Sequence, residues 1–86
     1  MPLPYSVHLR QEAFEFLQDR RKKDREELLS FFRQLGGNPF MTGDFQDPDD
    51  SGRPIEGVVL GYFAIYYWAD HSASELRVIA IRLADR

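Results

Sequence analysis

Hydrophobic residues follow two different spacings along the chain, and these spacings divide it into a helical part and a strand-rich part. In the helical part, a first apolar group lies at positions 13, 14, 16 and 17, as on one face of a helix. Ten polar residues, 18–27, separate it from a second group. The second group recurs at i, i+3, i+4 and i+7 and includes Leu28, Leu29, Phe31, Phe32 and Leu35. This spacing predicts a second amphipathic helix.

The sequence also predicts where the second helix begins and ends. Asp24 can accept hydrogen bonds from the amide groups of a first helical turn, and Glu27 follows three residues later, as in a capping box. At the other end, Gly36 and Gly37 suit a left-handed cap, and Pro39 cannot continue a helix. The polar segment between the helices is predicted to be a hairpin corner. One long bent helix stays open as an alternative, because no glycine or proline marks a turn there.

The remaining segments favour strands. Residues 5–9 alternate loosely and predict a first strand before the helices. Three aromatic or β-branched runs follow the helices, at residues 55–60, 62–69 and 76–83, with short turns between them. The segment 40–54 is rich in Asp, Gly and Pro and is long for a loop in a compact domain. We therefore expect it either to be functional or to contain a further short element.

These elements occur in the order βααβββ, which predicts an α+β fold in a single domain, residues 1–86. The apolar stripes of the helical hairpin must pack on one face of a small, twisted, mainly antiparallel sheet. In the strand 62–69, both faces are apolar or aromatic, because side chains alternate and Tyr62, Tyr66 and Trp68 share one of them. The helices cover one face, and the other is expected to meet a partner or to lie under segment 40–54. We expect Tyr62 and Trp68 to contact such a partner.

Composition and charge limit the classes of function. The 86 residues contain no cysteine and no apolar run near the roughly 18–20 residues that would span a bilayer, so we expect a soluble, cytoplasmic protein without a membrane contact. The net charge is −3, with seven basic and six acidic residues in 1–43 and four basic and eight acidic residues in 44–86. Proteins dedicated to nucleic-acid binding are usually strongly basic, so any such contact here must be local.

The basic segment Arg20-Arg21-Lys22-Lys23-Asp24-Arg25 is the place where such a contact is expected. Five of its six residues are basic, although the chain is acidic. The alternative is that it is only the solvated corner between the helices. The residues assigned to an RNA or target contact are Arg21, Lys22, Lys23, Arg25 and Arg86.

The sequence predicts no cofactor and no metal site. His8 and His71 are the only histidines, and their spacing does not place two ligands on one face. The segment 47–52 imitates the start of a calcium loop, but Val58 stands where the bidentate glutamate is required.

Arginines and tyrosines on the predicted sheet remain as candidates for chemistry. A metal-free ribonuclease needs cations to stabilise the phosphorane and groups that move protons to and from the oxygens. Arg53, Arg77 and Arg82 are the candidate cations, and Tyr66 is the candidate base. The alternative is that these arginines pair with acidic residues across the strands.

The order of these motifs along nearly the whole chain resembles the RelE/ParE superfamily of toxins from toxin–antitoxin systems. The motifs are a short strand, a helical pair ending in Leu35, Asn38 and Pro39, then Gly52-Arg53, then Gly61-Tyr62 with Tyr66, an acidic turn, and a last strand beginning Leu-Arg-Val-Ile. The resemblance implies a growth-inhibiting toxin of the kind that also stabilises plasmids, neutralised by a cognate antitoxin encoded beside it. RelE-like members cleave mRNA on the ribosome without a metal, and ParE-like members poison DNA gyrase.

The resemblance also bears on whether this chain is an enzyme. The family's nucleases carry basic residues at positions that correspond here to Pro54, Glu56, Phe63 and Ala84. A glutamate near the phosphate is expected to repel it. The resemblance therefore favours a toxin that binds its target without chemistry of its own. A ribosome-dependent nuclease with a rearranged site and a non-toxic, protein-binding relative stay open as alternatives.

Overall fold

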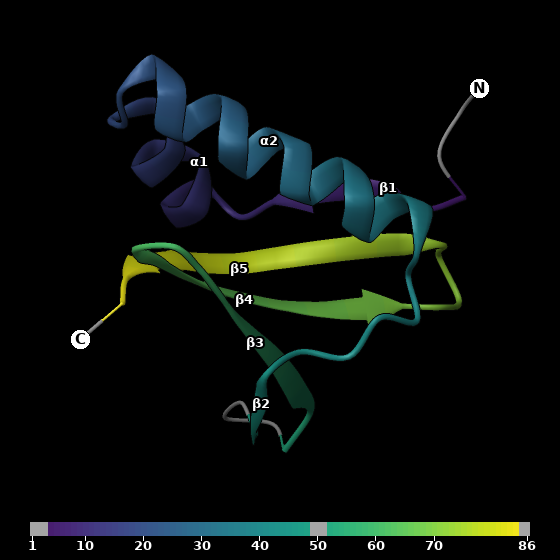
Figure 1. Cartoon of the computed structure of the whole chain (residues 1–86). Helices are drawn as coiled ribbons and strands as arrows, with labels where there is room; N and C mark the ends of the chain where they lie inside the picture. The colour runs from purple at the N-terminus through teal and green to yellow at the C-terminus, as the bar shows by residue number, and fades with distance from the viewer. Residues whose placement is uncertain (1–3, 49–51, 85–86) are drawn as a thin grey trace.

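The computed structural model describes residues 4–48 and 52–84, and it contains two helices and five strands (Figure 1). The helices are α1 (Gln11–Gln18) and α2 (Lys22–Gly37). The strands are β1 (Ser6–Leu9), β2 (Phe45–Pro48), β3 (Pro54–Leu60), β4 (Phe63–Asp70) and β5 (Glu75–Leu83). They form one sheet in the order β1-β5-β4-β3-β2. β1 runs parallel to β5, and the other neighbours are antiparallel.

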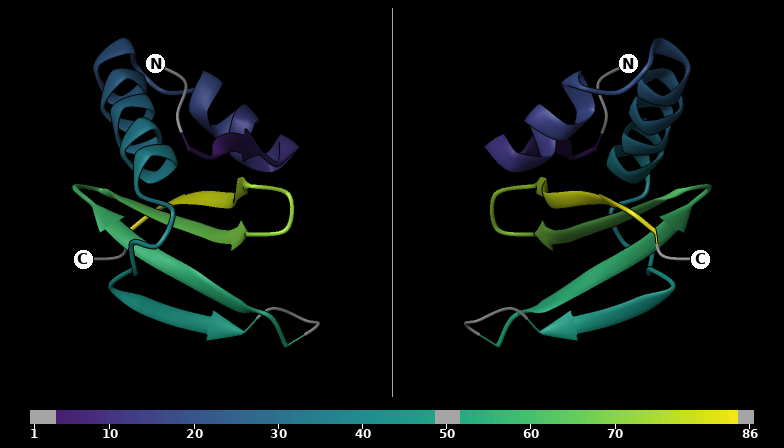
Figure 2. Two further views of the ribbon diagram at one scale, coloured as in Figure 1. Left: turned by 90° about the vertical axis from the view of Figure 1, so that its right-hand side faces the viewer. Right: turned by 90° about the vertical axis from the view of Figure 1, so that its left-hand side faces the viewer.

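Both helices lie on the same face of the sheet, as the sequence predicts (Figures 1 and 2). Their apolar stripes pack on inward-facing side chains of β4 and β5, and the resulting core is free of charged residues among those described. The most deeply buried members are Ala13, Leu28, Leu35, Ile65, Tyr67, Leu76 and Val78. The α+β fold class is confirmed, because the spacing of apolar residues fixes which side of each helix and strand is buried.

The segment 40–54 contains the further short element that was one expectation for it, a fifth strand whose position the sequence pattern did not reveal. β2 pairs with β3, with Phe45 opposite Gly57 and Asp47 opposite Ile55, and it forms the edge of the sheet (Figure 2). Its four residues, Phe-Gln-Asp-Pro, include a proline and an aspartate, which are poor strand formers. A proline is tolerated there because an edge strand need not use every backbone donor.

The corner between the helices differs from the expected capping box. The chain forms two separate helices, and the residue that precedes α2 is Arg21, in an extended conformation and without a side-chain cap. Asp24 lies inside the first turn of α2, where its carboxylate is 3.8 Å from the Arg21 guanidinium. The prediction of Asp24 as the cap is therefore wrong by one helical turn. The carboxylate still lies at the positive end of the helix dipole.

Two irregularities in the sheet decide how its side chains are presented. The register between β4 and β5 shifts between Tyr66 and Tyr67, so that Tyr66 faces Ala80 but Tyr67 faces Val78. β3 and β4 pair only as far as Glu56 and Tyr67, although β4 continues along β5 to Asp70. The two strands therefore separate at this end of the sheet, and a hollow opens between them.

Candidate functional site: an arginine-aromatic face of the sheet

The sheet face that points away from the helices carries five of the predicted site residues. Tyr66 and Trp68 are two residues apart on β4 and point to the same side, because side chains alternate along a strand. On β5, Arg77 lies opposite Trp68, and Arg82 lies opposite Ala64 on the same face of the sheet. Arg53 reaches this side from the residue before β3. We call Arg53, Tyr66, Trp68, Arg77 and Arg82 the arginine-aromatic face.

Trp68 organises one end of the arginine-aromatic face. The Arg53 guanidinium lies 3.9 Å from the centre of the indole ring, and that of Arg77 lies at 5.8 Å. Stacking on an aromatic ring fixes the plane of a guanidinium while its edge can still donate hydrogen bonds.

Arg77 is also held by two carboxylates, as the alternative reading of the sequence predicted. Its guanidinium lies 2.5 Å from Glu75 and 3.7 Å from Asp70. A hydrogen bond from Ser72, together with backbone donors and the nearby Arg77, lowers the pKa of Asp70, so this carboxylate stays charged. Arg77 is therefore largely neutralised within the chain, and it adds less positive charge to the face than its position suggests.

Tyr66 organises the other end of the face. The Arg82 guanidinium lies 5.4 Å from the centre of its ring, and the Phe45 ring contacts it edge-on at 5.8 Å. Arg82 is exposed and has no carboxylate partner within residues 4–48 and 52–84. Arg82 and Tyr66 thus supply a cation and a phenol side by side on an accessible surface.

Among the described residues of the segment 40–54, Phe45 covers this face at the β2 edge. The Phe45 ring lies directly on Gly57, so closely that a β-carbon added there would come within 2.3 Å of it. Ile55 and Ala64 are buried, whereas Tyr66 and Trp68 keep part of their surface exposed. Part of an aromatic surface is therefore accessible on the arginine-aromatic face, and its contact with a partner stays a prediction.

Tyr62 and the basic segment lie apart from this face. Tyr62 was expected at the start of a strand, but it stands in the turn between β3 and β4, next to Gly61, and its side chain is 74% exposed. It borders a hollow of about 530 Å³ that also includes Leu83 and basic residues of the helix corner. Tyr62 and Trp68 therefore belong to two different surfaces. Arg86 lies outside the described residues.

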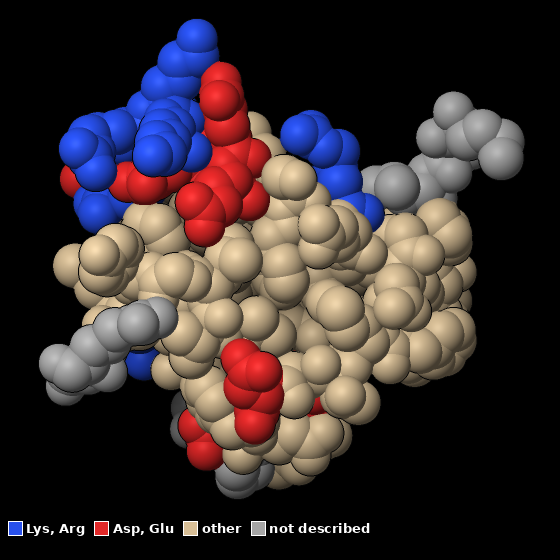
Figure 3. Space-filling view, viewed as in Figure 1, with Lys and Arg blue, Asp and Glu red and all other residues tan. Residues whose placement is uncertain are grey.

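The basic side chains gather at the corner where the helices meet, with acidic side chains directly beside them (Figure 3). Arg20 stacks on Phe16 with 4.2 Å between the guanidinium carbon and the ring centre, and it contacts Asp19. Arg25 donates a hydrogen bond to the Arg20 carbonyl oxygen. Lys22 and Lys23 are exposed. Arg20 and Arg25 therefore contribute contacts within the helix corner, whereas Arg21, Lys22 and Lys23 are exposed and available to a partner.

Two side chains that argued against a phosphate site, those of Glu56 and Phe63, point away from the arginine-aromatic face. Glu56 pairs with Tyr67, which points into the core, so its carboxylate lies on the helical side of the sheet rather than among the three arginines. Phe63 is a core residue. Glu56 nevertheless lines one pocket with Arg53, so the expected repulsion of a phosphate stays a prediction at that end of the face.

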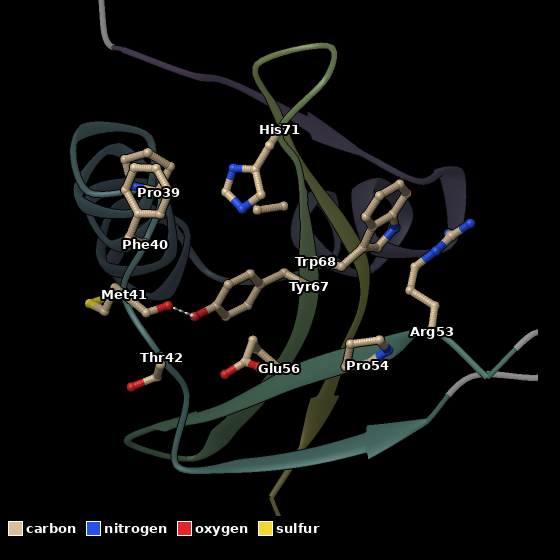
Figure 4. Close-up of a pocket in the computed structure, with 11 residues that line it drawn as sticks. Pro39, Phe40, Met41, Thr42, Arg53, Pro54, Glu56, Tyr67, Trp68 and His71 are labelled. Carbon is tan, nitrogen blue, oxygen red and sulfur yellow. Dashed lines mark hydrogen bonds between the residues drawn. The ribbon is translucent and has the colours of Figure 1, made fainter.

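A second concave site, missed by the sequence reading, lies where β3 and β4 separate (Figure 4). Tyr67 forms its floor and donates a 3.0 Å hydrogen bond to the Met41 carbonyl oxygen. Burial, with Glu56 and Asp44 nearby, raises the pKa of Tyr67 to about 12, so its hydroxyl stays protonated. The sequence showed these residues as a strand and a loop, and only the pairing of the strands brings them together.

The described residues contain neither a metal-binding cluster nor a membrane-spanning helix. Residues 4–48 and 52–84 contain no cluster of three or more metal-ligating side chains. None of the helices there is long and apolar enough to cross a bilayer.

The structure is similar over almost its whole length to solved toxin structures. The isolated E. coli RelE toxin matches with a TM-score of 0.76, at 16% identity over 95% of this chain and 86% of that chain. The YoeB/ParE toxin from Agrobacterium tumefaciens matches with a TM-score of 0.68, at 16% identity over 93% and 99%. The chain has the RelE/ParE toxin fold. A chain of the archaeal RelE–RelB complex from Pyrococcus horikoshii matches with a TM-score of 0.79, at 15% identity over 98% and 99%.

The RelE/ParE toxin fold is thus recognisable in three dimensions although the sequence identity to these structures is only 15% to 16%. No protein-family model and no curated protein sequence matches this chain. Within the RelE/ParE toxin fold of this chain, the arginine-aromatic face lies opposite the helical pair, on the side of the sheet that the helices leave uncovered.

Proposed function

We propose that this chain is the toxin of a type II toxin–antitoxin pair and that it grips a macromolecular target with its arginine-aromatic face. The similarity to RelE and ParE toxins covers more than nine-tenths of the chain, which supports the toxin role. The Pyrococcus relative was solved as a complex of RelE with RelB, which supports a cognate antitoxin as the neutralising partner here.

The observation that carries the proposal is the exposed pair of Arg82 and Tyr66 beside the stacked pair of Arg53 and Trp68. Stacked aromatic and guanidinium groups are the side chains that most often dominate macromolecular interfaces. Arg77 is neutralised by Glu75 and Asp70, so the face is only weakly cationic. This charge suits a target bound through mixed contacts better than one bound through phosphates alone. DNA gyrase and the translating ribosome are the two targets proposed.

Expression without an antitoxin tests the toxin role. We expect growth arrest from the native chain, and at least a tenfold gain in colony-forming units from Arg82→Ala. The matched control is Arg33→Ala. Arg33 is an exposed arginine of α2, so this substitution removes the same charge from the helical layer instead. Both variants should keep the circular dichroism spectrum of the native chain. Normal growth on expression of the native chain would instead support a non-toxic, protein-binding relative.

A metal-free endoribonuclease is the second candidate function, and the position of Arg82 over Tyr66 favours it. In that function the Tyr66 phenol takes part in proton transfer at the ribose, and Arg82 stabilises the charge on the phosphorane. Tyr66→Phe keeps the ring and removes the hydroxyl, so it should abolish cleavage while target binding persists. Primer extension on RNA from arrested cells is the measurement. Intact transcripts, together with blocked DNA supercoiling, would assign the arrest to gyrase instead.

A further inference from the structure

The hollow between the loop 38–43 and the separated ends of β3 and β4 has the features of a ligand pocket. Its volume is about 460 Å³, within the range of about 300–1,000 Å³ typical of small-molecule sites. Figure 4 shows Phe40 and His71 on one side, Trp68 and Arg53 on the other, and Tyr67 with Glu56 between them. Phe40 and His71 stack with 5.0 Å between ring centres and 10° between planes. Aromatic walls on two sides favour a flat ring as the occupant.

The floor of this pocket offers hydrogen-bond acceptors. The Tyr67 hydroxyl donates to the Met41 carbonyl and its side chain is 1% exposed, so Glu56 rather than Tyr67 supplies the acceptors. The Glu56 carboxylate receives one hydrogen bond from the Gly43 amide, at 2.6 Å, and one from the Gln46 side chain. A carboxylate has about four acceptor sites, so about two remain for a ligand. The ligand edge that reaches the floor should therefore carry N–H donors.

We propose that this pocket binds the guanine base of a free guanine nucleotide, with Glu56 as the residue that reads the base. Guanine alone among the common bases presents two adjacent N–H donors, at N1 and N2, that can meet one carboxylate. Adenine, cytosine and uracil place an acceptor beside their donor, and this acceptor would face the Glu56 oxygens. At the rim, Arg53 is the one lysine or arginine that lines the pocket within residues 4–48 and 52–84, and it favours a ligand that carries phosphate.

Binding of GMP, IMP and UMP to the purified chain tests this assignment, and it does not depend on the toxin proposal because no cells are used. Nuclear magnetic resonance titration is suitable, with the Trp68 indole N–H as reporter. IMP lacks only the N2 amino group, so losing one hydrogen bond to the charged Glu56 should weaken binding roughly tenfold relative to GMP. UMP should bind weakest. Equal affinities for GMP and UMP would overturn the proposal.

The variant Glu56→Gln supplies the second arm. The N–H of the glutamine amide would face the N–H donors of guanine. The ratio of the affinities for GMP and IMP should therefore fall to about twofold or less. The ratio of the two affinities is the readout because it is insensitive to a general loss of stability. Arg33→Ala should keep the native ratio. A ratio unchanged by Glu56→Gln would overturn the role of Glu56.

A third arm separates a free nucleotide from a guanine within an RNA strand. Both present the same base, but a strand also contacts the arginine-aromatic face through Trp68 and Arg53, which the pocket shares with that face. GMP should bind within about tenfold of a guanine-containing trinucleotide. A trinucleotide that binds a hundredfold more tightly than GMP would overturn the assignment to a free nucleotide and give the pocket to an RNA strand.

Discussion

Tyr67 shows how one residue links the core, the middle loop and the pocket. Its side chain is 1% exposed, and its hydroxyl donates to the Met41 carbonyl oxygen, which fixes the loop against β4. Its pKa is raised to about 12 from 10.0, first by burial and then by Glu56 and Asp44. Between pH 10 and 12 the unfolded chain loses this proton while the folded chain keeps it. The stabilisation is therefore complete below pH 10 and is lost as the pH rises towards 12.

The variant Tyr67→Phe tests this linkage. At pH 7 we expect a loss of about 1 kcal/mol in the free energy of unfolding, because the Met41 carbonyl loses its donor. The difference between native chain and variant should narrow between pH 10 and 12, because only the native chain loses stability by ionising this residue. Urea unfolding at several pH values is the measurement. Tyr62→Phe controls for the loss of a hydroxyl at an exposed tyrosine. A difference for Tyr67→Phe that stays constant across this pH range would contradict the account.

At the scale of elements, β2 illustrates a strand that is held by its surroundings rather than by its own propensity. The Asp44 amide donates to the Gly57 carbonyl at 2.7 Å, and the Asp44 carboxylate accepts from the Val59 amide at 2.8 Å. Glu56 accepts from the Gly43 amide at the start of the same segment. These bonds attach the segment to β3, and they place the Phe45 ring on the arginine-aromatic face.

Removing one of these attachments should loosen β2 selectively. Asp44→Ala removes the acceptor of the Val59 amide, and we expect it to lower the free energy of unfolding by about 1 kcal/mol and to speed amide exchange in β2. Asp47→Ala is the matched control on the same strand, because Asp47 is exposed and should change stability by less than about 0.5 kcal/mol. Hydrogen exchange with mass spectrometry gives the comparison, and equal effects of the two substitutions would count against this role of Asp44.

At the scale of the whole molecule, basic side chains are most concentrated at the helix corner (Figure 3), and Arg53 and Arg82 add a smaller group on the arginine-aromatic face. At the corner, acidic residues lie among the basic ones, and Arg21 is 3.8 Å from Asp24. Ion pairs on a surface contribute little to stability and are screened by salt. The corner therefore fits a solvated helix junction better than the principal phosphate-binding site.

A triple substitution of Arg21, Lys22 and Lys23 by alanine distinguishes these roles. We expect stability to change by less than about 0.5 kcal/mol per site and growth arrest to persist, whereas Arg82→Ala should relieve it. If the corner binds phosphate, the triple variant should weaken ribosome binding and flatten its dependence on salt concentration. Sedimentation with ribosomes at several salt concentrations makes the comparison.

Apolar spacing was enough to predict most of the fold, for a physical reason. The stripes of Leu28, Phe31, Phe32 and Leu35 and the alternation in β4 each permit only one buried side, so the helical layer and the sheet follow from local pattern. β2 escaped prediction because its pairing with β3 depends on bonds from Asp44 and Glu56, which are distant in sequence from their partners. The sequence did not predict the residue that caps α2, because an extended Arg21 can precede a helix without a side-chain hydrogen bond.

The sequence by itself determined which residue types were available for function: four arginines, three tyrosines and one tryptophan in residues 44–86. Only the tertiary structure decided which of them meet, because contacts across a sheet depend on register, and a shift of one residue moves a side chain to the other face. That register placed Arg82 over Tyr66 and Arg53 over Trp68, tied Arg77 to carboxylates, and turned Glu56 to the opposite side, into a pocket with Tyr67.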